Sequence, residues 1–277
     1  MARPDHPAAE APSRTVISAV DIAAPASTIW KALTQPREIG RWFAPEVSGS
    51  GEVGGTIRLD WGGGTTWDMP VRHAEAPTLL VLGDAGPIGH EHRATGADSG
   101  AVRIEYRLQP AGAGITRVTV THSGFGAGSD WDEMYDGVTT GWFYELRSLK
   151  HYAEHFFGRD RRVVTVRAPI GDSRETVWKR LLDALAIRPS EIREGATINA
   201  VLRDAGPEPV RIFQARPDRI ISGFAPNLGD AMVRFGVERC GGSELELWVW
   251  LSAHDAAPAD VGAFERRWRA GAAAIAG

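Results

Sequence analysis

The chain lacks the features that mark several large classes of protein. Its single cysteine, Cys240, excludes an internal disulfide, and no apolar run approaches the ~18 residues of a membrane helix. It has no dense run of Lys and Arg, and its formal net charge is −4. The basic surface that binds nucleic acid is therefore missing. These absences predict a soluble, cytoplasmic protein with no nucleic-acid or membrane partner.

The first residues contain no apolar segment of the kind that a signal peptide needs. Met1 to Arg14 are instead rich in Ala and Pro. We therefore expect residues 1–13 to form a disordered leader. The remaining chain is long enough for two domains of ordinary size, and its 43% hydrophobic and 24% charged residues are typical of globular proteins.

An internal repeat indicates how the chain is divided. Thr-Ile-Trp-Lys-Ala-Leu at 28–33 recurs as Thr-Val-Trp-Lys-Arg-Leu at 176–181, and each copy follows a β-branched run, at 15–22 and 163–167. This predicts the same strand-to-helix entry twice. Pro25 suits the opening position of the first helix, and Asp172 with Glu175 predicts a capping box at the start of the second.

Both halves continue with short strands and end in a helix. In the first half we expect strands at 57–61, 67–71, 79–82, 102–108 and 118–122, with a hairpin loop at 111–114, and then a long amphipathic helix over about 129–157. In the second half we expect strands near 196–202, 210–215, 220–224, 231–238 and 244–252, and a closing helix through 261–275. The basic link at 159–162 separates two domains, 14–158 and 162–277.

The motifs of the first half resemble a known family. They are Trp-Lys-Ala-Leu-Thr-Gln-Pro at 30–36, Arg-Trp-Phe-Ala-Pro at 41–45, Val-Gly-Gly at 53–55, and Gly-Trp at 141–142 inside the long helix. In order and spacing they are similar to the START-like (SRPBCC) superfamily, in the branch of the C-terminal domain of heat-shock-protein ATPase activators. The second half lacks the Arg-Trp-Phe-x-Pro and Gly-Trp motifs, so we interpret it as a degenerate copy.

The resemblance implies an α+β protein of two tandem helix-grip domains, each a curved antiparallel sheet packed around a long C-terminal helix. It also implies an apolar cavity between sheet and helix, because members of the family bind lipids, sterols, polyketides or hormones. Mostly aromatic and apolar side chains of the first half that we expect to face this cavity are the candidate ligand contacts, although each is also a natural core residue. The candidates are Trp42, Trp61, Trp67, Met69, Tyr106, His122, Met134, Val138, Trp142 and Leu146.

Polar candidates are few. His122 has the inward parity of Val118 and Val120, so it is either a ligand contact that polarises a carbonyl or a structural histidine. His90 and His92 lie in a Gly-rich loop without further ligands at metal-site spacing, and we predict no metal, no cofactor and no catalytic residue.

The functional hypotheses follow from this inventory. The first is binding or sequestering of an apolar small molecule without catalysis. The alternatives are an enzyme of the polyketide cyclase or aromatase kind and, on the family name alone, a regulator of a chaperone ATPase. Trp248 and Trp250 share the strand face opposite the aliphatic residues Leu247 and Val249, which predicts a contact with the first domain or with another subunit.

Overall fold

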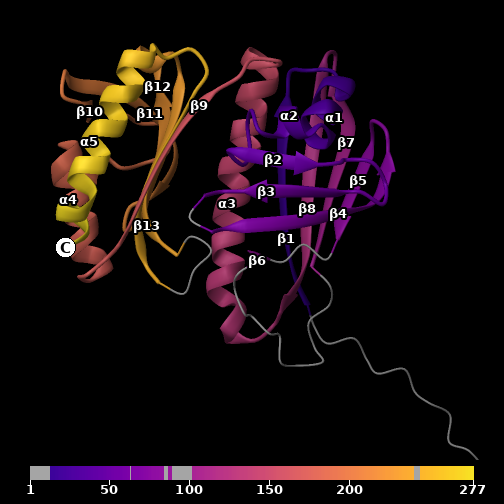
Figure 1. The fold of residues 1–277 in the computed structure, drawn as a ribbon, viewed down its shortest axis with the longest axis horizontal. Coiled ribbons are helices and arrows are strands. Elements are labelled where there is room, and N and C mark those ends of the chain that lie inside the picture. Colours follow the sequence, from indigo (N-terminus) through magenta and orange to yellow (C-terminus); the bar gives the residue numbers. More distant parts are fainter. Residues whose placement is uncertain (1–12, 63, 84–86, 89–101, 240–243) are drawn as a thin grey trace, which may run out of the picture. The chain divides into compact units, whose positions relative to one another are not determined.

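The computed structural model describes residues 13–62, 64–83, 87–88, 102–239 and 244–277 (Figure 1). It divides the chain into two compact units, which we describe separately. The N-terminal unit comprises Met1–Gly40 and Glu46–Glu154, and the C-terminal unit comprises Arg41–Pro45 and His155–Gly277. Both are α+β units built on an antiparallel sheet.

The N-terminal unit opens with a strand and two short helices, continues as a meander, and ends in a long helix. Its elements are β1 (Ser13–Ile22), α1 (Ala26–Thr34), α2 (Pro36–Ile39), β2 (Glu46–Gly49), β3 (Thr56–Asp60), β4 (Thr66–Glu75), β5 (Leu79–Gly83), β6 (Pro87–Ile88), β7 (Arg103–Gly112), β8 (Ile115–Gly126), the short 3-10 turn η1 (Ser129–Trp131), α3 (Asp132–His151) and the π-helical turn η2 (Tyr152–Phe156). The strand order is β1-β8-β7-β5-β4-β3-β2, and β6 pairs with β4.

Alternation of apolar and polar residues gives this sheet its buried face. In β7, Ile104, Tyr106 and Leu108 are buried and their neighbours point away, as the sequence pattern predicts. β7 and β8 pair with Tyr106 opposite Val120, and Gly114 supplies the positive φ of 70° that the hairpin turn needs. The predicted hairpin is confirmed.

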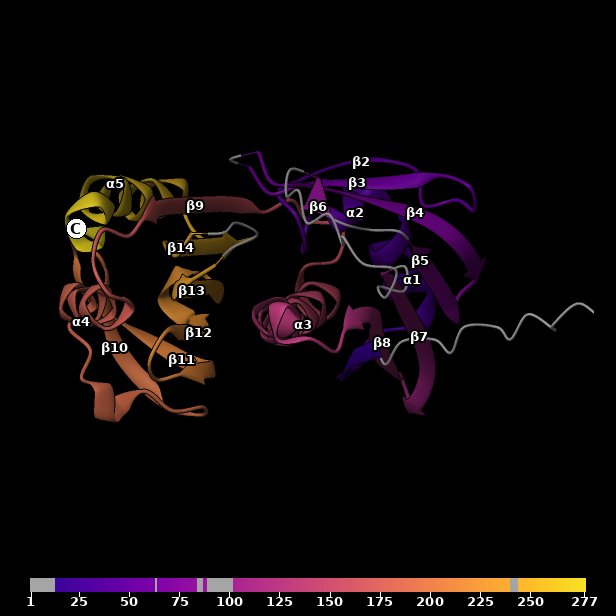
Figure 2. The same ribbon diagram turned by 90° about the horizontal axis from the view of Figure 1, so that it is seen from below.

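The long helix α3 packs along β1 (Figures 1 and 2). Its buried side chains recur in steps of three and four and include Trp142, Leu146 and Leu149. The helix was expected to continue to residue 157, but it ends at His151 and the chain makes a π-helical turn over Tyr152–Phe156. In that turn the fully buried Tyr152 donates its hydroxyl to the carboxylate of Glu38, which joins the helix end to α2.

The C-terminal unit repeats the topology with fewer elements. They are β9 (Arg162–Pro169), α4 (Arg174–Leu185), η3 (Pro189–Glu191), β10 (Thr197–Arg203), β11 (Gly206–Arg216), β12 (Ile220–Ala225), η4 (Pro226–Leu228), β13 (Ala231–Glu238), β14 (Glu246–Ala253) and α5 (Pro258–Ala276). The strand order is β10-β11-β12-β13-β14-β9. In both units the first strand pairs with the last strand, a helix follows the first strand, and a long helix follows the last strand. The tandem helix-grip prediction agrees with this shared order.

One face of the second sheet carries the core of this unit. Leu247, Val249 and Leu251 of β14 pack with Phe264 and Trp268 of α5 in a single buried cluster. The opposite parity carries Trp248, half-buried, and Trp250, 3% exposed, with ring centroids 6.1 Å apart in a T-shaped pair. The predicted alternation of β14 is therefore confirmed, and the partner of its two indoles stays a prediction.

The two helix starts differ in detail from the sequence-based expectation. Ser173, not Asp172, caps α4 by accepting from the backbone N–H of Thr176 at 3.3 Å. Asp172 instead pairs with Arg180 at 2.7 Å, because it lies one residue too early to reach the first free N–H groups. Pro25 occupies the position just before α1 rather than its first helical position.

Candidate functional site

His122 lies near the end of β8 on the face of the sheet that is turned toward α3. It faces Val16 of β1 and Ile104 of β7 in the strand register. Its side chain has the parity of the buried Val118 and Val120, and the residue is 4% exposed. The predicted inward orientation of His122 is therefore what the structure has.

A hydrogen bond from α3 determines which nitrogen of His122 carries the proton. The indole Nε1–H of Trp142 donates to Nδ1 of His122 at 3.0 Å. An indole N–H can only donate, so Nδ1 is the acceptor and the neutral ring carries its proton on Nε2. Nε2 is buried, and within the described part of the chain it has no hydrogen-bond partner. The site thus presents one unsatisfied N–H donor inside an apolar environment.

Aromatic rings pack around the imidazole of His122. The ring centroids of Phe125 and His122 are 4.7 Å apart. The ring of Trp142 makes edge contacts with His122 and Tyr106, with centroid distances of 6.0 and 5.7 Å. The ring of Phe125 in turn packs against those of Tyr135 and Trp131, with centroid distances of 5.8 and 6.3 Å. We name this set the aromatic cluster; it consists of Tyr106, His122, Phe125, Trp131, Tyr135 and Trp142.

Phe125 was missed by the sequence analysis because strict alternation places it on the other face. Gly124 has φ +97°, and the β1–β8 register skips it: Arg14 faces Phe125 and Thr15 faces Ser123. This bulge shifts the parity of β8 by one residue and brings Phe125 onto the side of His122. The glycine inside the strand pattern was the available signal.

Burial controls the protonation of the two titratable groups. Desolvation lowers the pKa of His122 to about 4, since an imidazolium would lose its hydration without gaining an acidic partner. Desolvation, followed by the charge of Glu145, raises the pKa of Tyr106 well above its usual value. Both groups are neutral near pH 7, so the cluster offers hydrogen bonds and apolar surface rather than charge.

The structure brings together three of the ten predicted ligand contacts, Tyr106, His122 and Trp142. The strand pairing places Trp67 toward the same end of the sheet as this group. Val71, Leu82, Ile104 and His122 form one row across β4, β5, β7 and β8, and Trp67 and Phe125 both lie beyond that row toward the same end of the sheet.

The other predicted contacts take various positions. Met69 is buried in β4, while Trp61 and Trp67 near the β3–β4 turn and Met134 and Val138 on α3 are half-buried. Leu146 is buried and lines a groove against β1.

Trp42 belongs to the C-terminal unit, so it is not a member of the aromatic cluster. It belongs to Arg41–Pro45 and stacks on Phe43 with ring centroids 4.9 Å apart. Within that unit Arg161 donates to the carbonyl of Phe43 at 2.5 Å, and His254 Nε2 lies 3.1 Å from the carbonyl of Arg41.

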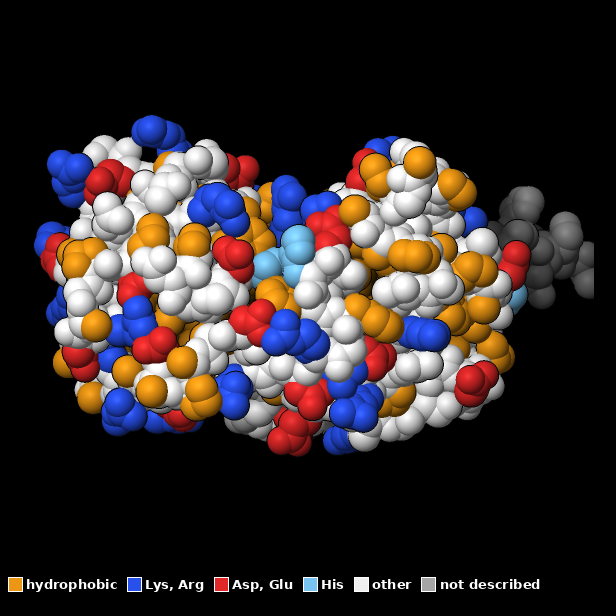
Figure 3. Space-filling view, turned by 90° about the horizontal axis from the view of Figure 1, so that it is seen from above, with side chains coloured by type: hydrophobic (Ala, Val, Ile, Leu, Met, Phe, Trp, Pro, Cys, Tyr) orange, Lys and Arg blue, Asp and Glu red, His pale blue; other side chains and the backbone are white. Residues whose placement is uncertain are grey.

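Metal-binding, membrane-spanning and nucleic-acid-binding proteins each have a characteristic pattern of residues, with which the described residues can be compared. The described residues contain no group of three or more His, Cys, Asp and Glu side chains that would hold a metal ion, and none of their helices is both long and apolar enough to cross a membrane. His90, His92 and Cys240 lie outside the described residues. On the face shown in Figure 3, basic and acidic side chains are interspersed, which is not the pattern of a nucleic-acid surface.

Comparisons with known proteins agree with the N-terminal motifs. The family model for activator of Hsp90 ATPase homolog 1-like protein matches residues 23–154. No curated protein matches the chain.

Several solved structures are distantly similar. The Aha1 dimer from Colwellia psychrerythraea is 24% identical, with 52% of this chain and 99% of that chain covered and a TM-score of 0.44. CalU16 from Micromonospora echinospora is 24% identical over 52% of this chain and 78% of that chain, with a TM-score of 0.40. DynU16, from the dynemicin biosynthetic locus, is 20% identical over 95% of both chains, with a TM-score of 0.43.

The family match begins just after β1 and covers α1, α2, the strands β2 to β8 and α3. The residues of the aromatic cluster all lie within it. Residues 23–154 of this chain therefore belong to the family of activator of Hsp90 ATPase homolog 1-like proteins, within the START-like helix-grip superfamily.

Proposed function

We propose that the N-terminal unit binds an apolar small molecule that carries a hydrogen-bond acceptor, at the aromatic cluster. The observation that carries this proposal is the Nε2–H of His122, a donor that is buried and has no partner in the described part of the chain. A buried donor without a partner costs about 1–3 kcal/mol. A ligand carbonyl or ether oxygen removes that cost, and the surrounding rings supply apolar contact for the rest of the molecule.

Entry of a ligand requires the cluster to rearrange. Nε2 is enclosed by its neighbours, so the oxygen of a ligand reaches it only when a ring moves. Met134 and Val138 on the first turns of α3 and Trp67 on β4 are only half-buried, and we expect these side chains to move when a ligand enters. Binding therefore selects or induces a conformation in which the cluster is more open.

Simple binding accounts for the site better than an acid–base reaction does. A general base needs a pKa near the working pH, whereas burial lowers the pKa of His122 to about 4 and Trp142 occupies its Nδ1. The cyclase-type alternative therefore lacks a suitable base within the described cluster.

The second candidate, regulation of a chaperone ATPase, is favoured by one observation, the family-model match over residues 23–154. It is tested by adding the full chain to a bacterial Hsp90 and measuring ATP turnover. A stimulation of about twofold or more would favour it, and unchanged turnover would count against it.

The binding proposal is tested with two ligands of nearly the same shape. 9-Fluorenone has a carbonyl oxygen and fluorene has none, so their affinities differ by the contribution of one acceptor. We expect fluorenone to bind the full chain about tenfold more tightly than fluorene, the ratio that one buried hydrogen bond provides. Quenching of tryptophan fluorescence and calorimetry measure the two affinities.

The variant His122→Phe keeps a ring and removes the donor. It should reduce the fluorenone-to-fluorene ratio to about one, while His73→Asn, at an exposed position of β4, should leave the ratio unchanged. Absence of binding for both ligands up to their solubility limits would overturn the proposal, and so would a ratio that survives His122→Phe.

A further inference from the structure

Side chains of α3 and of the turn η2 that follows it hydrogen-bond to the outer edge of β1 and to Ala23 just after this strand. Tyr135 donates its hydroxyl to the carbonyl of Thr15 at 3.1 Å, Lys150 donates to the carbonyl of Asp21 at 2.6 Å, and Glu154 accepts from the N–H of Ala23 at 2.6 Å. β1 is an edge strand, because β8 is its only sheet neighbour in the described part of the chain. Residues of α3 and η2 thus cover the two ends of an edge that would otherwise be open.

The middle of the same edge is uncovered. Thr15, Asp21 and Ala23 are odd-numbered, and alternate residues of a strand direct their N–H and C=O to the same edge, so the groups of Ile17 and Ala19 also point outward. Within the described residues these backbone groups have no hydrogen-bond partner on that side. Ile17 is also 69% exposed, the highest exposed fraction among the large apolar side chains that the structure describes.

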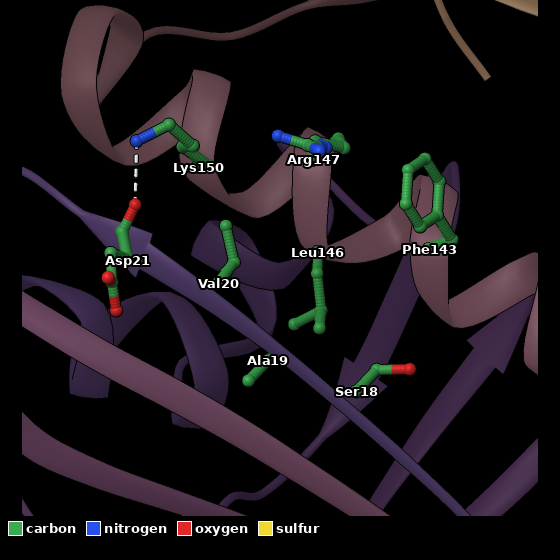
Figure 4. A pocket seen from close by; sticks show the side chains of 8 residues that line it. All are labelled: Ser18, Ala19, Val20, Asp21, Phe143, Leu146, Arg147 and Lys150. Carbon is green, nitrogen blue, oxygen red and sulfur yellow. Dashed lines mark hydrogen bonds between the residues drawn. The ribbon is translucent and has the colours of Figure 1, made fainter. Parts of the chain in front are cut away.

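A half-open groove of about 440 Å³ lies along this edge (Figure 4). Its wall contains four consecutive residues of β1, Ser18 to Asp21, so it follows the edge of the strand rather than either face. Across from them are Phe143, Leu146, Arg147 and Lys150 of α3, and in Figure 4 the side chain of Leu146 points toward β1. The groove is therefore apolar at its base and polar along its strand side.

One cation at this groove has no acidic partner. Lys150 is paired with Glu154 at 2.6 Å, and Asp21 with Arg117 at 2.7 Å. Arg147 instead lies over the ring of Phe143, 5.1 Å from its centroid, and forms no ion pair with a carboxylate in the described part of the chain. The groove thus offers a positive charge beside the outward N–H and C=O groups of Ala19, and the same groups of Ile17 continue this strand edge just outside the groove.

We propose that this groove binds an extended acidic peptide by strand addition. The backbone of the peptide pairs with Ile17 and Ala19, an apolar side chain packs on Leu146 and Phe143, and a carboxylate of the peptide pairs with Arg147. The occupant is a peptide segment rather than the β1 strand of a second copy, because each copy would bring its own α3 along the edge that has to pair. The site is separate from the aromatic cluster and its ligand.

The test uses the full chain and the blocked peptide acetyl-Thr-Val-Glu-Val-Thr-amide, with its Glu→Gln analogue as the comparison. Titration followed by ¹⁵N NMR should shift the amides of Ile17, Ala19 and Arg147 saturably. The acidic peptide should bind about threefold more tightly than its analogue, as expected of one exposed ion pair. Arg147→Met should abolish that preference while retaining the weaker binding.

A pair of variants at one position isolates the backbone contribution. Ile17→Thr replaces the exposed apolar side chain with a polar one and keeps the N–H, whereas Ile17→Pro also removes the N–H, a change that an edge strand tolerates. We expect Ile17→Pro to weaken peptide binding at least tenfold relative to Ile17→Thr. Thermal unfolding confirms that both variants fold, and the Arg147→Met result provides an independent test if one does not.

Three outcomes would overturn the proposal. The first is no saturable shift of β1 and α3 amides at millimolar peptide, and the second is equal binding to Ile17→Pro and Ile17→Thr. The third is a mass that rises with protein concentration in sedimentation and returns to the monomer value in Ile17→Pro, since this would assign the edge to a second copy.

Discussion

Trp142 and His122 are joined by a 3.0 Å hydrogen bond from the indole Nε1–H to the imidazole Nδ1. The bond links the middle of α3 to the end of β8, and it leaves the remaining imidazole proton on Nε2. The orientation of one helix on its sheet and the protonation of one buried group are thereby determined by the same contact.

This relationship predicts the tautomer directly. In the folded chain near pH 7, ¹⁵N NMR should show a protonated Nε2 and an unprotonated Nδ1 for His122. Trp142→Phe removes the donor and leaves a buried acceptor, so we expect the free energy of unfolding to fall by about 1–3 kcal/mol. Urea titration measures this change.

The double variant Trp142→Phe with His122→Phe provides the control. If the hydrogen bond accounts for the loss, the two changes together should cost less than the sum of their separate effects. Strict additivity would show that the two side chains contribute independently.

The lowered pKa of His122 predicts how stability depends on pH. Its pKa is about 4 in the folded chain and near the ordinary 6.5 when unfolded. Between these values the unfolded state binds more protons, so stability falls as the pH drops from 6.5 toward 4. The shift corresponds to about 3 kcal/mol at pH values below 4.

Comparing the wild type with a variant that lacks His122 separates the pH dependence due to this histidine from that due to Asp and Glu side chains, which also titrate in acid. The difference in unfolding free energy between the wild type and His122→Phe, measured by urea titration from pH 7 to pH 4, should change steadily through the window. A difference that stays constant would mean that the pKa of His122 is the same in the folded and the unfolded chain.

The bulge at Gly124 should be sensitive to substitution. Gly124 has φ +97°, a conformation that a residue with a Cβ adopts only under strain, so Gly124→Ala should destabilise the unit by about 1–3 kcal/mol. The strain falls on the residue that orients Phe125, so fluorenone binding should weaken as well.

Gly137→Ala is the matched control for this variant. Gly137 lies in α3, where a new Cβ meets no atom within 4 Å. An exposed helix gains about 0.5–1 kcal/mol from this change. Equal effects of the two substitutions would contradict the role given to the bulge.

A buried ion pair in the C-terminal unit gives a prediction about that unit. Arg203 of β10 pairs with Glu208 of β11, whose side chain is 7% exposed, and with Asp260 of α5 at 2.5 Å. Arg203→Met leaves the Glu208 carboxylate buried without this guanidinium, and we expect a loss of about 3 kcal/mol.

Hydrogen exchange of the β10 and β11 amides localises the effect to this unit. The double variant Arg203→Met with Glu208→Met should recover much of the loss, because it removes the buried charge together with its partner. A single variant as stable as the wild type would show that water already solvates the pair.

Several features were predictable because they depend on local patterns. The alternation of Ile104, Tyr106 and Leu108 determined the buried face of β7, and the recurrence of Trp30 as Trp178 predicted the shared entry of both units. The inward direction of His122 followed from the parity of Val118 and Val120.

Other features depend on geometry that a pattern does not contain. A one-residue bulge at Gly124 changed the parity of β8 and brought Phe125 into the site. The hydrogen bond from Trp142 depends on how α3 is rotated above the sheet. Trp42 carries a family motif, yet the chain departs from its neighbours at Arg41–Pro45 and joins the C-terminal unit. Sequence spacing alone does not reveal such a departure.

The pairing of first and last strands has a consequence for synthesis of the chain. β1 finds β8, and β9 finds β14, only after nearly the whole of the respective unit has left the ribosome. Such distant partners give a high contact order, which slows folding. Until β8 emerges, β1 has no strand partner, so the backbone N–H and C=O groups of β1 stay unpaired for most of the translation of the N-terminal unit.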